Sequence, residues 1–188
     1  TNDWITGPTM PTSRYAVAAG AISGKLYAVG GGAGGGSRFN TLEIYETGVT
    51  TVSGNIATTT WTAANSPYYV TGTVTVPTGN TLTIEPGVDV LFDADVQFVV
   101  QGALNAVGTE ADSIRFVKDK AAEWGGIRFS GGDSSTIHYA RISDGNADGV
   151  DPYNDGGAIY ASGSGTRIGV QNAVISNNKS GSNGGGVN

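Results

Sequence analysis

Short apolar strands recur along the chain at a nearly constant spacing, and this spacing constrains the fold more than any other feature. Two strands centre on Phe98 and Ile127, a third contains Ile159, and a fourth begins at Val187. The intervals are 29, 32 and 28 residues, and three of the four strands follow paired glycines. A sequence period of about 20–50 residues is typical of solenoids, in which each repeat buries its apolar face against its neighbours.

Two further short strands lie between successive members of this series. They are predicted at residues 103–107 and 113–117, at 135–140 and 140–144, and at 166–170 and 173–177. Three short strands per repeat predict a right-handed parallel β-helix of about three to four coils. The amides of Asn172, Asn177 and Asn178 suit its turns, where stacked amides hydrogen-bond along the axis. An antiparallel β-sandwich also has short strands and glycine-rich turns, but the regular period favours the β-helix.

The alternating strands also predict which side chains fill the interior. Side chains at every second strand position leave the same face, so one apolar set per strand should stack in columns. The predicted interior residues are Ile84, Phe98, Ile114, Ile127, Ile137, Ile142, Ile159, Ile168 and Ile175.

Composition supports an all-β fold and excludes some kinds of site. The 188 residues suffice for one domain or two small ones, and segments that favour helix are nearly absent. Only Lys118–Trp124 could form a turn or two of helix. A net charge of −6 argues against nucleic acid as a partner and is compatible with divalent cations. The chain has no cysteine, and no apolar run approaches the ~20 residues of a transmembrane helix.

The first 48 residues differ from the rest and predict a separate antiparallel strand unit. Arg14–Ile22 and Lys25–Val29 are predicted strands joined by a tight turn, and Thr41–Tyr45 is a third. The segment resembles a kelch repeat in the order of its marker residues, which are Met10-Pro11, Arg14-Tyr15, Tyr27, Gly30-Gly31 and Tyr45. Kelch repeats close into propellers of several blades, whereas this sequence shows one repeat.

Two further regions follow the kelch-like unit. Residues 49–70 are rich in Thr, Ser and Ala and are predicted to be a linker or a lead-in strand, and residues 71–188 are the predicted β-helix. The segment Gly79–Gly87 resembles the N-terminal part of bacterial secreted β-helix proteins. The Gly-Gly-Ala-Ile and Ile-Ser-Asn-Asn sequences are similar to the repeats of polymorphic bacterial outer-membrane proteins and related adhesins. This resemblance implies an extracellular or cell-surface location.

An acidic segment, Asp144–Asp155, matches a calcium-binding pattern. It fits D-x-N-x-D-G over its first six positions and places a carboxylate at position 12. The predicted Ca²⁺ ligands are Asp144, Asn146, Asp148, the Val150 carbonyl and Asp155. The segment also resembles the calcium loops of dockerins and thrombospondin type 3 repeats, although Asp151 and Pro152 depart from the pattern. A solvated acidic turn is the alternative interpretation.

Catalytic function has weaker support. Some parallel β-helices are polysaccharide lyases or glycoside hydrolases, which need a base or a carboxylate pair on one exposed face. The candidate residues are Lys118, Asp119, Lys120, Glu123, Arg128, Arg141 and Arg167, and they form no recognisable lyase or hydrolase signature. Arg128 and Arg141 are predicted to point outward as solubilising charges, and His138 to face solvent.

The resemblance to bacterial surface proteins implies a non-catalytic extracellular or cell-surface module, which we expect to act in adhesion, binding or head-to-tail self-assembly. The expected partners are further copies of the chain, or a polysaccharide or cell-surface glycan. Several aromatic residues could stack on sugar rings or instead belong to the core, namely Trp4, Trp61, Tyr68, Tyr69 and Trp124. The alternative function is a carbohydrate-active enzyme, a lyase or a hydrolase, on the same scaffold.

Overall fold

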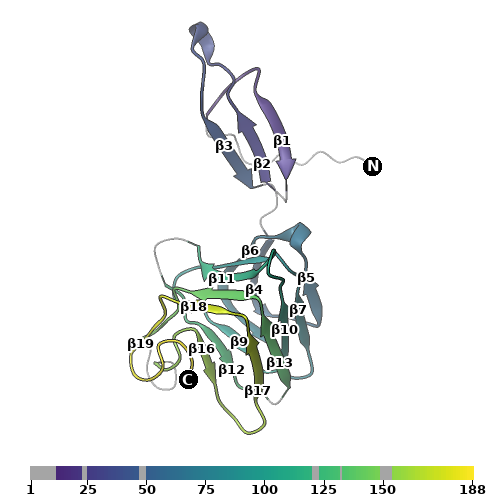
Figure 1. Ribbon diagram of the computed structural model, residues 1–188, viewed down its shortest axis with the longest axis vertical. Helices are drawn as coiled ribbons and strands as arrows, with labels where there is room; N and C mark the ends of the chain where they lie inside the picture. The colour runs from purple at the N-terminus through teal and green to yellow at the C-terminus, as the bar shows by residue number, and fades with distance from the viewer. Residues whose placement is uncertain (1–11, 23–24, 47–49, 120–122, 132, 149–153) are drawn as a thin grey trace. The chain divides into compact units, whose positions relative to one another are not determined.

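The computed structural model describes residues 12–22, 25–46, 50–119, 123–131, 133–148 and 154–188. The chain divides into two compact units, Thr1–Val49 and Thr50–Asn188 (Figure 1). Within the described residues, strands and two short 3-10 turns, Gly34–Gly36 and Ala63–Asn65, are the regular elements, and there is no α-helix. The expected all-β fold is therefore confirmed. Of the segment that could have formed a helical turn, Lys118 ends a strand, and residues 120–122 lie outside the described residues.

The first unit is a three-stranded antiparallel sheet. Its strands are β1 (Ala18–Ile22), β2 (Lys25–Val29) and β3 (Leu42–Glu46), in the order β1-β2-β3. The registers place Tyr27 between Gly20 on β1 and Ile44 on β3. The antiparallel strands agree with the kelch-like pattern, although β1 starts four residues later than the predicted Arg14.

The second unit consists of parallel strands arranged in three stacks that form a curled sheet (Figure 1). The first stack contains β5 (Thr59–Trp61), β7 (Thr81–Ile84), β10 (Ala103–Val107), β13 (Ser134–His138) and β17 (Arg167–Gln171). The second contains the first halves of β4 (Thr50–Asn55) and β6 (Tyr68–Val76), then β8 (Asp89–Phe92), β11 (Ile114–Lys118), β14 (Ala140–Ser143) and β18 (Val174–Ser176). The third contains the second halves of β4 and β6, then β9 (Phe98–Val100), β12 (Ile127–Phe129) and β16 (Ile159–Ala161). A short parallel pair, β15 (Asn146–Ala147) with β19 (Lys179–Ser180), lies outside these stacks.

The chain visits the three stacks in the same order, circuit after circuit. In the third stack, Phe98 pairs with Ile127 and Ile127 with Ile159. Ile159 in turn forms a parallel bridge with Val187. The intervals of 29, 32 and 28 residues read from the sequence therefore separate residues that are paired between successive circuits.

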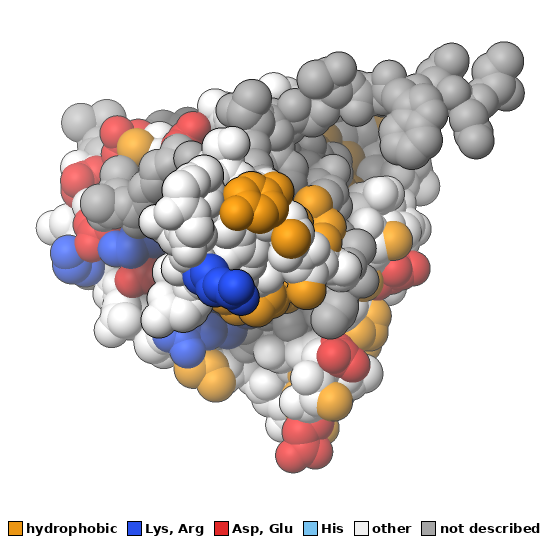
Figure 2. Space-filling model, turned by 90° about the horizontal axis from the view of Figure 1, so that it is seen from above, with side chains coloured by type: hydrophobic (Ala, Val, Ile, Leu, Met, Phe, Trp, Pro, Cys, Tyr) orange, Lys and Arg blue, Asp and Glu red, His pale blue; other side chains and the backbone are white. Residues whose placement is uncertain are grey.

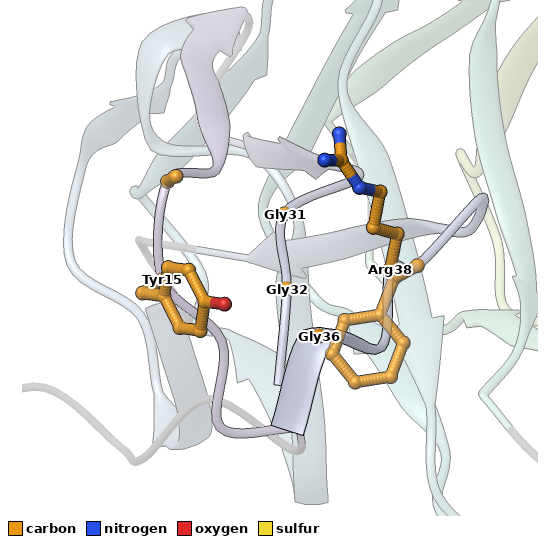
Figure 3. A pocket seen from close by; sticks show the side chains of 7 residues that line it. Tyr15, Gly31, Gly32, Gly36 and Arg38 are labelled. Atoms are coloured by element: carbon orange, nitrogen blue, oxygen red, sulfur yellow. The ribbon is translucent and has the colours of Figure 1, made fainter. Parts of the chain in front are cut away.

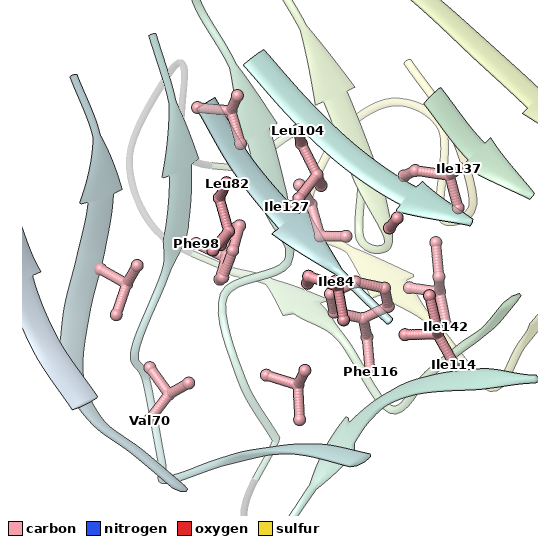
Figure 4. Close-up of a cluster of buried hydrophobic side chains, with 14 of the residues drawn as sticks. Val70, Leu82, Ile84, Phe98, Leu104, Ile114, Phe116, Ile127, Ile137 and Ile142 are labelled. Atoms are coloured by element: carbon pink, nitrogen blue, oxygen red, sulfur yellow. The ribbon is translucent and has the colours of Figure 1, made fainter. Parts of the chain in front are cut away.

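The interior of the second unit is one apolar cluster (Figure 4). Seven of the nine predicted interior residues are buried there, namely Ile84, Phe98, Ile114, Ile127, Ile137, Ile142 and Ile159. Burial of each such side chain contributes roughly 1.5–3 kcal/mol. Ile168 and Ile175 are only half-buried, because they lie on β17 and β18, which have a paired strand on one side only in the described structure.

Paired glycines mark positions where successive circuits approach closely. A Cβ atom on Gly157 would lie 2.0 Å from the Lys179 carbonyl oxygen and 2.4 Å from that of Gly185. On Gly126 it would lie 2.6 Å from the Gly157 carbonyl oxygen. No side chain fits at these positions, which explains why glycine recurs with the period of the fold.

Within residues 49–70, predicted to be a linker or a lead-in strand, residues 50–70 form the beginning of the second unit. They carry β4, β5 and the start of β6. Trp61 and Tyr68 are buried in this segment, and their rings stack with centroids 4.6 Å apart. Aromatic packing against the first full circuit therefore gives this Thr- and Ser-rich segment a fixed place in the sheet.

Candidate functional site

Four of the predicted calcium ligands, Asp144, Asn146, Asp148 and Asp155, are described by the structure. They follow β14, and each forms a hydrogen bond within the protein. Asp144 Oδ2 accepts a 2.8 Å hydrogen bond from Ser143 Oγ, and Asn146 Nδ2 donates to Asp148 Oδ2 at 2.9 Å. Asp155 Oδ1 accepts from the Asn183 backbone N–H at 2.8 Å. Val150 lies outside the described residues. Among the described residues, no three His, Cys, Asp or Glu side chains come together as a metal site, so calcium binding stays a prediction.

Asparagine at the predicted turns links neighbouring circuits. Asn178 Oδ1 accepts a hydrogen bond from the Gly145 N–H at 2.8 Å. Its Nδ2 donates to the carbonyl oxygens of Ile142 at 3.1 Å and Ser176 at 2.9 Å. Asn172 Nδ2 lies 2.9 Å from His138 Nε2. Asn178 and Asn172 therefore hydrogen-bond to the neighbouring circuit, but their partners there are backbone groups and a histidine ring rather than stacked amides.

The charged residues considered for catalysis are spread over different environments. Arg141 and Arg167 are exposed, whereas Lys120 lies outside the described residues. Glu123 accepts a 2.6 Å hydrogen bond from Lys179 Nζ, and this bond raises the pKa of Lys179 above its ordinary value. His138 is half-buried and lies against the Tyr139 ring.

Arg128 is buried, so the prediction that it is a solvated charge is wrong, although it alternates with the core residues Ile127 and Phe129 and therefore leaves the outer face of the strand. Only 4% of the residue is exposed. Its guanidinium donates to the Asp155 carbonyl oxygen at 3.3 Å and lies 5.3 Å from the centre of the Tyr160 ring. Arg128 is on β12, which has strands on both sides, and the chain between Asp155 and Tyr160 covers it. The burial of Arg128 therefore depends on how the next part of the chain stacks on β12.

The described tryptophans belong to the core. Trp124 is fully buried, stacks on Phe92 with ring centroids 3.8 Å apart, and donates Nε1–H to the Ser143 carbonyl oxygen at 2.9 Å. Trp61 stacks on Tyr68, and both are buried. Trp4 lies outside the described residues, and Tyr69 is half-buried. Core packing therefore explains Trp61, Tyr68 and Trp124, which are not accessible to a sugar ring.

The first unit contains a hollow of about 450 Å³ at its glycine-rich loop, here called the loop hollow. It is lined by Tyr15, Ala16, Gly31, Gly32, Gly36, Arg38 and Phe39. Figure 3 shows the Tyr15 and Arg38 side chains on opposite sides of the Gly31–Gly32 segment. Backbone hydrogen bonds between Tyr15 and Gly32, at 3.0 and 2.9 Å, hold this segment in place. A Cβ on Gly31 would lie 2.7 Å from the Tyr15 carbonyl oxygen, so the close approach requires glycine.

Two further hollows lie in the second unit. The first, the arginine hollow, has about 510 Å³ and is lined by Ser113, Arg115, Val117, Lys118, Arg141, Ser143 and Asp144. It brings together two catalytic candidates and one predicted calcium ligand, and sequence reasoning missed Arg115. The second, the end hollow, has about 300 Å³ and is lined by Ile159, Ala161, Thr166, Ile168, Val170, Val187 and Asn188.

Charge is interspersed on the surface. Figure 2 shows one face of the molecule, on which Lys and Arg side chains occur in separate small groups, some of them beside acidic side chains. None of the described residues belongs to a helix with the length and apolar character needed to cross a bilayer.

Comparison with known families identifies one motif in the N-terminal part of the chain. The family described as Kelch motif matches residues 13–66, less than a third of the chain. This match supports the kelch-like repeat. Its last part includes β4 and β5, which pair in parallel with β6 and β7 in the second unit. No curated protein and no solved structure matches the chain.

Proposed function

We propose that the second unit is a right-handed parallel β-helix that acts as a non-catalytic binding and assembly module outside the cell or at its surface. The observation that carries the proposal is the repeated parallel register through Phe98, Ile127, Ile159 and Val187. Parallel strands joined by crossover connections are almost always right-handed. A stack of circuits filled by apolar side chains presents rows of outward side chains, which suits an extended binding surface.

The environments of the charged residues favour binding over catalysis. Glu123 is engaged by Lys179, and Arg128 is covered by the chain around Asp155. Arg167 is on the first stack, whereas Arg141 is on the second. A lyase or hydrolase needs its acid and base close together on an exposed face. We expect neither unsaturated products nor new reducing ends when the chain is incubated with acidic and neutral polysaccharides, and product formation would support the enzyme alternative.

The end hollow supports self-assembly, the second part of the proposed function. Two valines of this hollow are exposed, at 38% for Val170 on β17 and 54% for Val187 in the bridge to β16. In the described structure β17 pairs with β13 alone, so its other edge offers free backbone N–H and C=O groups. Such an edge recruits another strand, and an apolar surface beside it strengthens the contact.

Light scattering of the purified chain tests assembly, with two matched variants. Val170→Lys places a charge at the end hollow, whereas Val107→Lys changes a valine of nearly equal exposure, 37%, on β10, which has strands on both sides. We expect the mass to rise with concentration beyond that of a dimer, and only Val170→Lys to abolish the rise. A monomer at all concentrations contradicts self-assembly, and a mass that stops at a dimer contradicts head-to-tail growth.

A further inference from the structure

Two arginines occupy paired positions on neighbouring strands of the second stack. The register between β11 and β14 pairs Arg115 with Arg141. Neighbouring strands lie about 4.7–4.9 Å apart, and paired side chains leave the same face of the sheet. Like charges in such a position repel each other. A pair of this kind persists at a cost to stability, which points to a function that needs both charges.

The acidic side chains nearby neutralise only part of this charge. Asp89, which is paired with Arg115 on β8, forms an ion pair with it, with 3.2 Å between Asp89 Oδ2 and Arg115 Nη1. On the other side, Arg141 is paired in register with Val174, and no ion pair joins Arg141 to the residues that the structure describes. The excess positive charge of the arginine pair therefore lies at Arg141.

The arginine hollow adds a third cation. Lys118 Nζ lies 3.8 Å from Asp144 Oδ1, while Asp144 Oδ2 is occupied by Ser143 Oγ. The lining of the hollow holds Arg115, Lys118 and Arg141 together with Asp144, and Asp89 is paired with Arg115, which leaves three cations against two acids and one positive charge in excess. This local excess occurs in a chain whose net charge is −6.

We propose that Arg115 and Arg141 bind a carboxylate of an acidic polysaccharide in the arginine hollow. The proposal rests on the binding function proposed above and names its ligand class. Guanidinium groups bind carboxylates through paired charge-assisted hydrogen bonds. Both side chains are accessible, since 49% of the Arg115 side chain is exposed and Arg141 is exposed. Val174, beside Arg141 in register, offers an apolar surface to the carbon face of a sugar ring.

Calorimetric titration of the purified full chain tests this site with three probes. The probes are sodium sulfate, oligogalacturonate and an uncharged galactose oligosaccharide of the same length. We expect oligogalacturonate to bind, the uncharged oligosaccharide not to bind, and the affinity to fall as salt is added. Arg141→Gln should weaken oligogalacturonate binding roughly tenfold or more. The control is Arg167→Gln, which removes an exposed arginine from the first stack and should leave the affinity unchanged.

The stability of Arg141→Gln provides a second readout. Since this substitution removes a like-charge neighbour of Arg115, the ligand-free variant should melt no lower than the original chain. Absence of oligogalacturonate binding, or equal weakening by Arg141→Gln and Arg167→Gln, would overturn the site. Binding of sulfate without oligogalacturonate would overturn the polysaccharide assignment. Binding of the uncharged oligosaccharide alone would overturn the site but not the binding function, whereas cleavage of bound oligogalacturonate would overturn the non-catalytic function but not the site.

Discussion

At the scale of single residues, Arg14 organises the first unit. Its side chain is 1% exposed and forms an ion pair with Glu43 on β3. The guanidinium donates to the Gly30 carbonyl oxygen at 2.8 Å and lies 4.8 Å from the centre of the Phe39 ring. A small sheet depends on such polar connections, and among the side chains of this unit whose burial is described, Ala28 is the buried hydrophobic one.

Replacement of Arg14 should therefore loosen the first unit. Arg14→Ala leaves the Gly30 carbonyl oxygen without its donor and removes the contact with Phe39, at a cost of about 1–3 kcal/mol. Hydrogen exchange of the β2 and β3 amides measures this loss, and the second unit should be unaffected. Arg38→Ala is the control, because Arg38 is exposed at the loop hollow. Equal exchange in the two variants would contradict the role assigned to Arg14.

The same contacts predict how the first unit responds to acid. A hydrogen bond with Thr12 and the nearby charge of Arg14 lower the pKa of the Glu43 carboxyl below its ordinary value of 4.5. A lowered pKa in the folded state means that stability is present above pH 4.5 and is lost as the pH falls through the folded pKa. Amide protection of β3, corrected for intrinsic exchange, should decrease in that range. The decrease should be smaller in Glu43→Gln, and an identical pH profile would refute the assignment.

At the scale of elements, the distance between successive circuits is limited by glycine. Gly157 approaches the Lys179 carbonyl oxygen of the next circuit more closely than any Cβ allows. Asn178, on the next circuit, donates to and accepts from the same turn region. Close backbone contacts and the hydrogen bonds of the Asn178 amide therefore hold the turns in place. The strands are held by the stacked apolar side chains of the interior.

Two glycine substitutions with opposite expected effects test this account. Gly157→Ala places a Cβ 2.0 Å from the Lys179 carbonyl oxygen, so the circuits must separate, at a cost of about 1–3 kcal/mol. Gly169→Ala on β17 has its nearest atom at 3.9 Å and should be neutral or stabilising by up to about 1 kcal/mol. Urea unfolding of both variants measures the difference. Similar stabilities would show that the circuits do not meet closely at Gly157.

At the scale of the whole molecule, the two ends of the parallel sheet differ. The first strand, β4, is polar and its register shifts between Val52 and Gly54, where Gly54 has a φ of 73°. Bulges and polar residues protect a sheet edge from pairing. The other end carries the exposed valines of the end hollow. Any contact with another strand is thus expected at the end that carries β17 and β18.

Calcium binding in the turn region should stabilise the whole second unit. The segment Asp144–Asp155 concentrates carboxylates, and a ligand of the native state stabilises it by mass action, by about 2.7 kcal/mol at a hundredfold excess over Kd. We expect millimolar Ca²⁺ to raise the melting temperature. Asp148→Asn should remove the increase, whereas Asp93→Asn, an exposed residue of another turn, should retain it. Calorimetry without heat of binding at millimolar Ca²⁺ would contradict the prediction.

The sequence by itself determined the all-β class, the antiparallel strands of the first unit and the spacing of circuits in the second. Each of these can be read from a single strand or turn. The alternation of apolar and polar residues decides which side chains face inward, and glycine marks where the backbone approaches a neighbouring backbone. Only the tertiary structure decided that residues 50–70 begin the parallel sheet, that Arg128 is buried, and that Arg115 lies beside Arg141. These outcomes depend on the register between circuits and on the path of the connecting turns. Residues 26 positions apart become neighbours only once both are fixed.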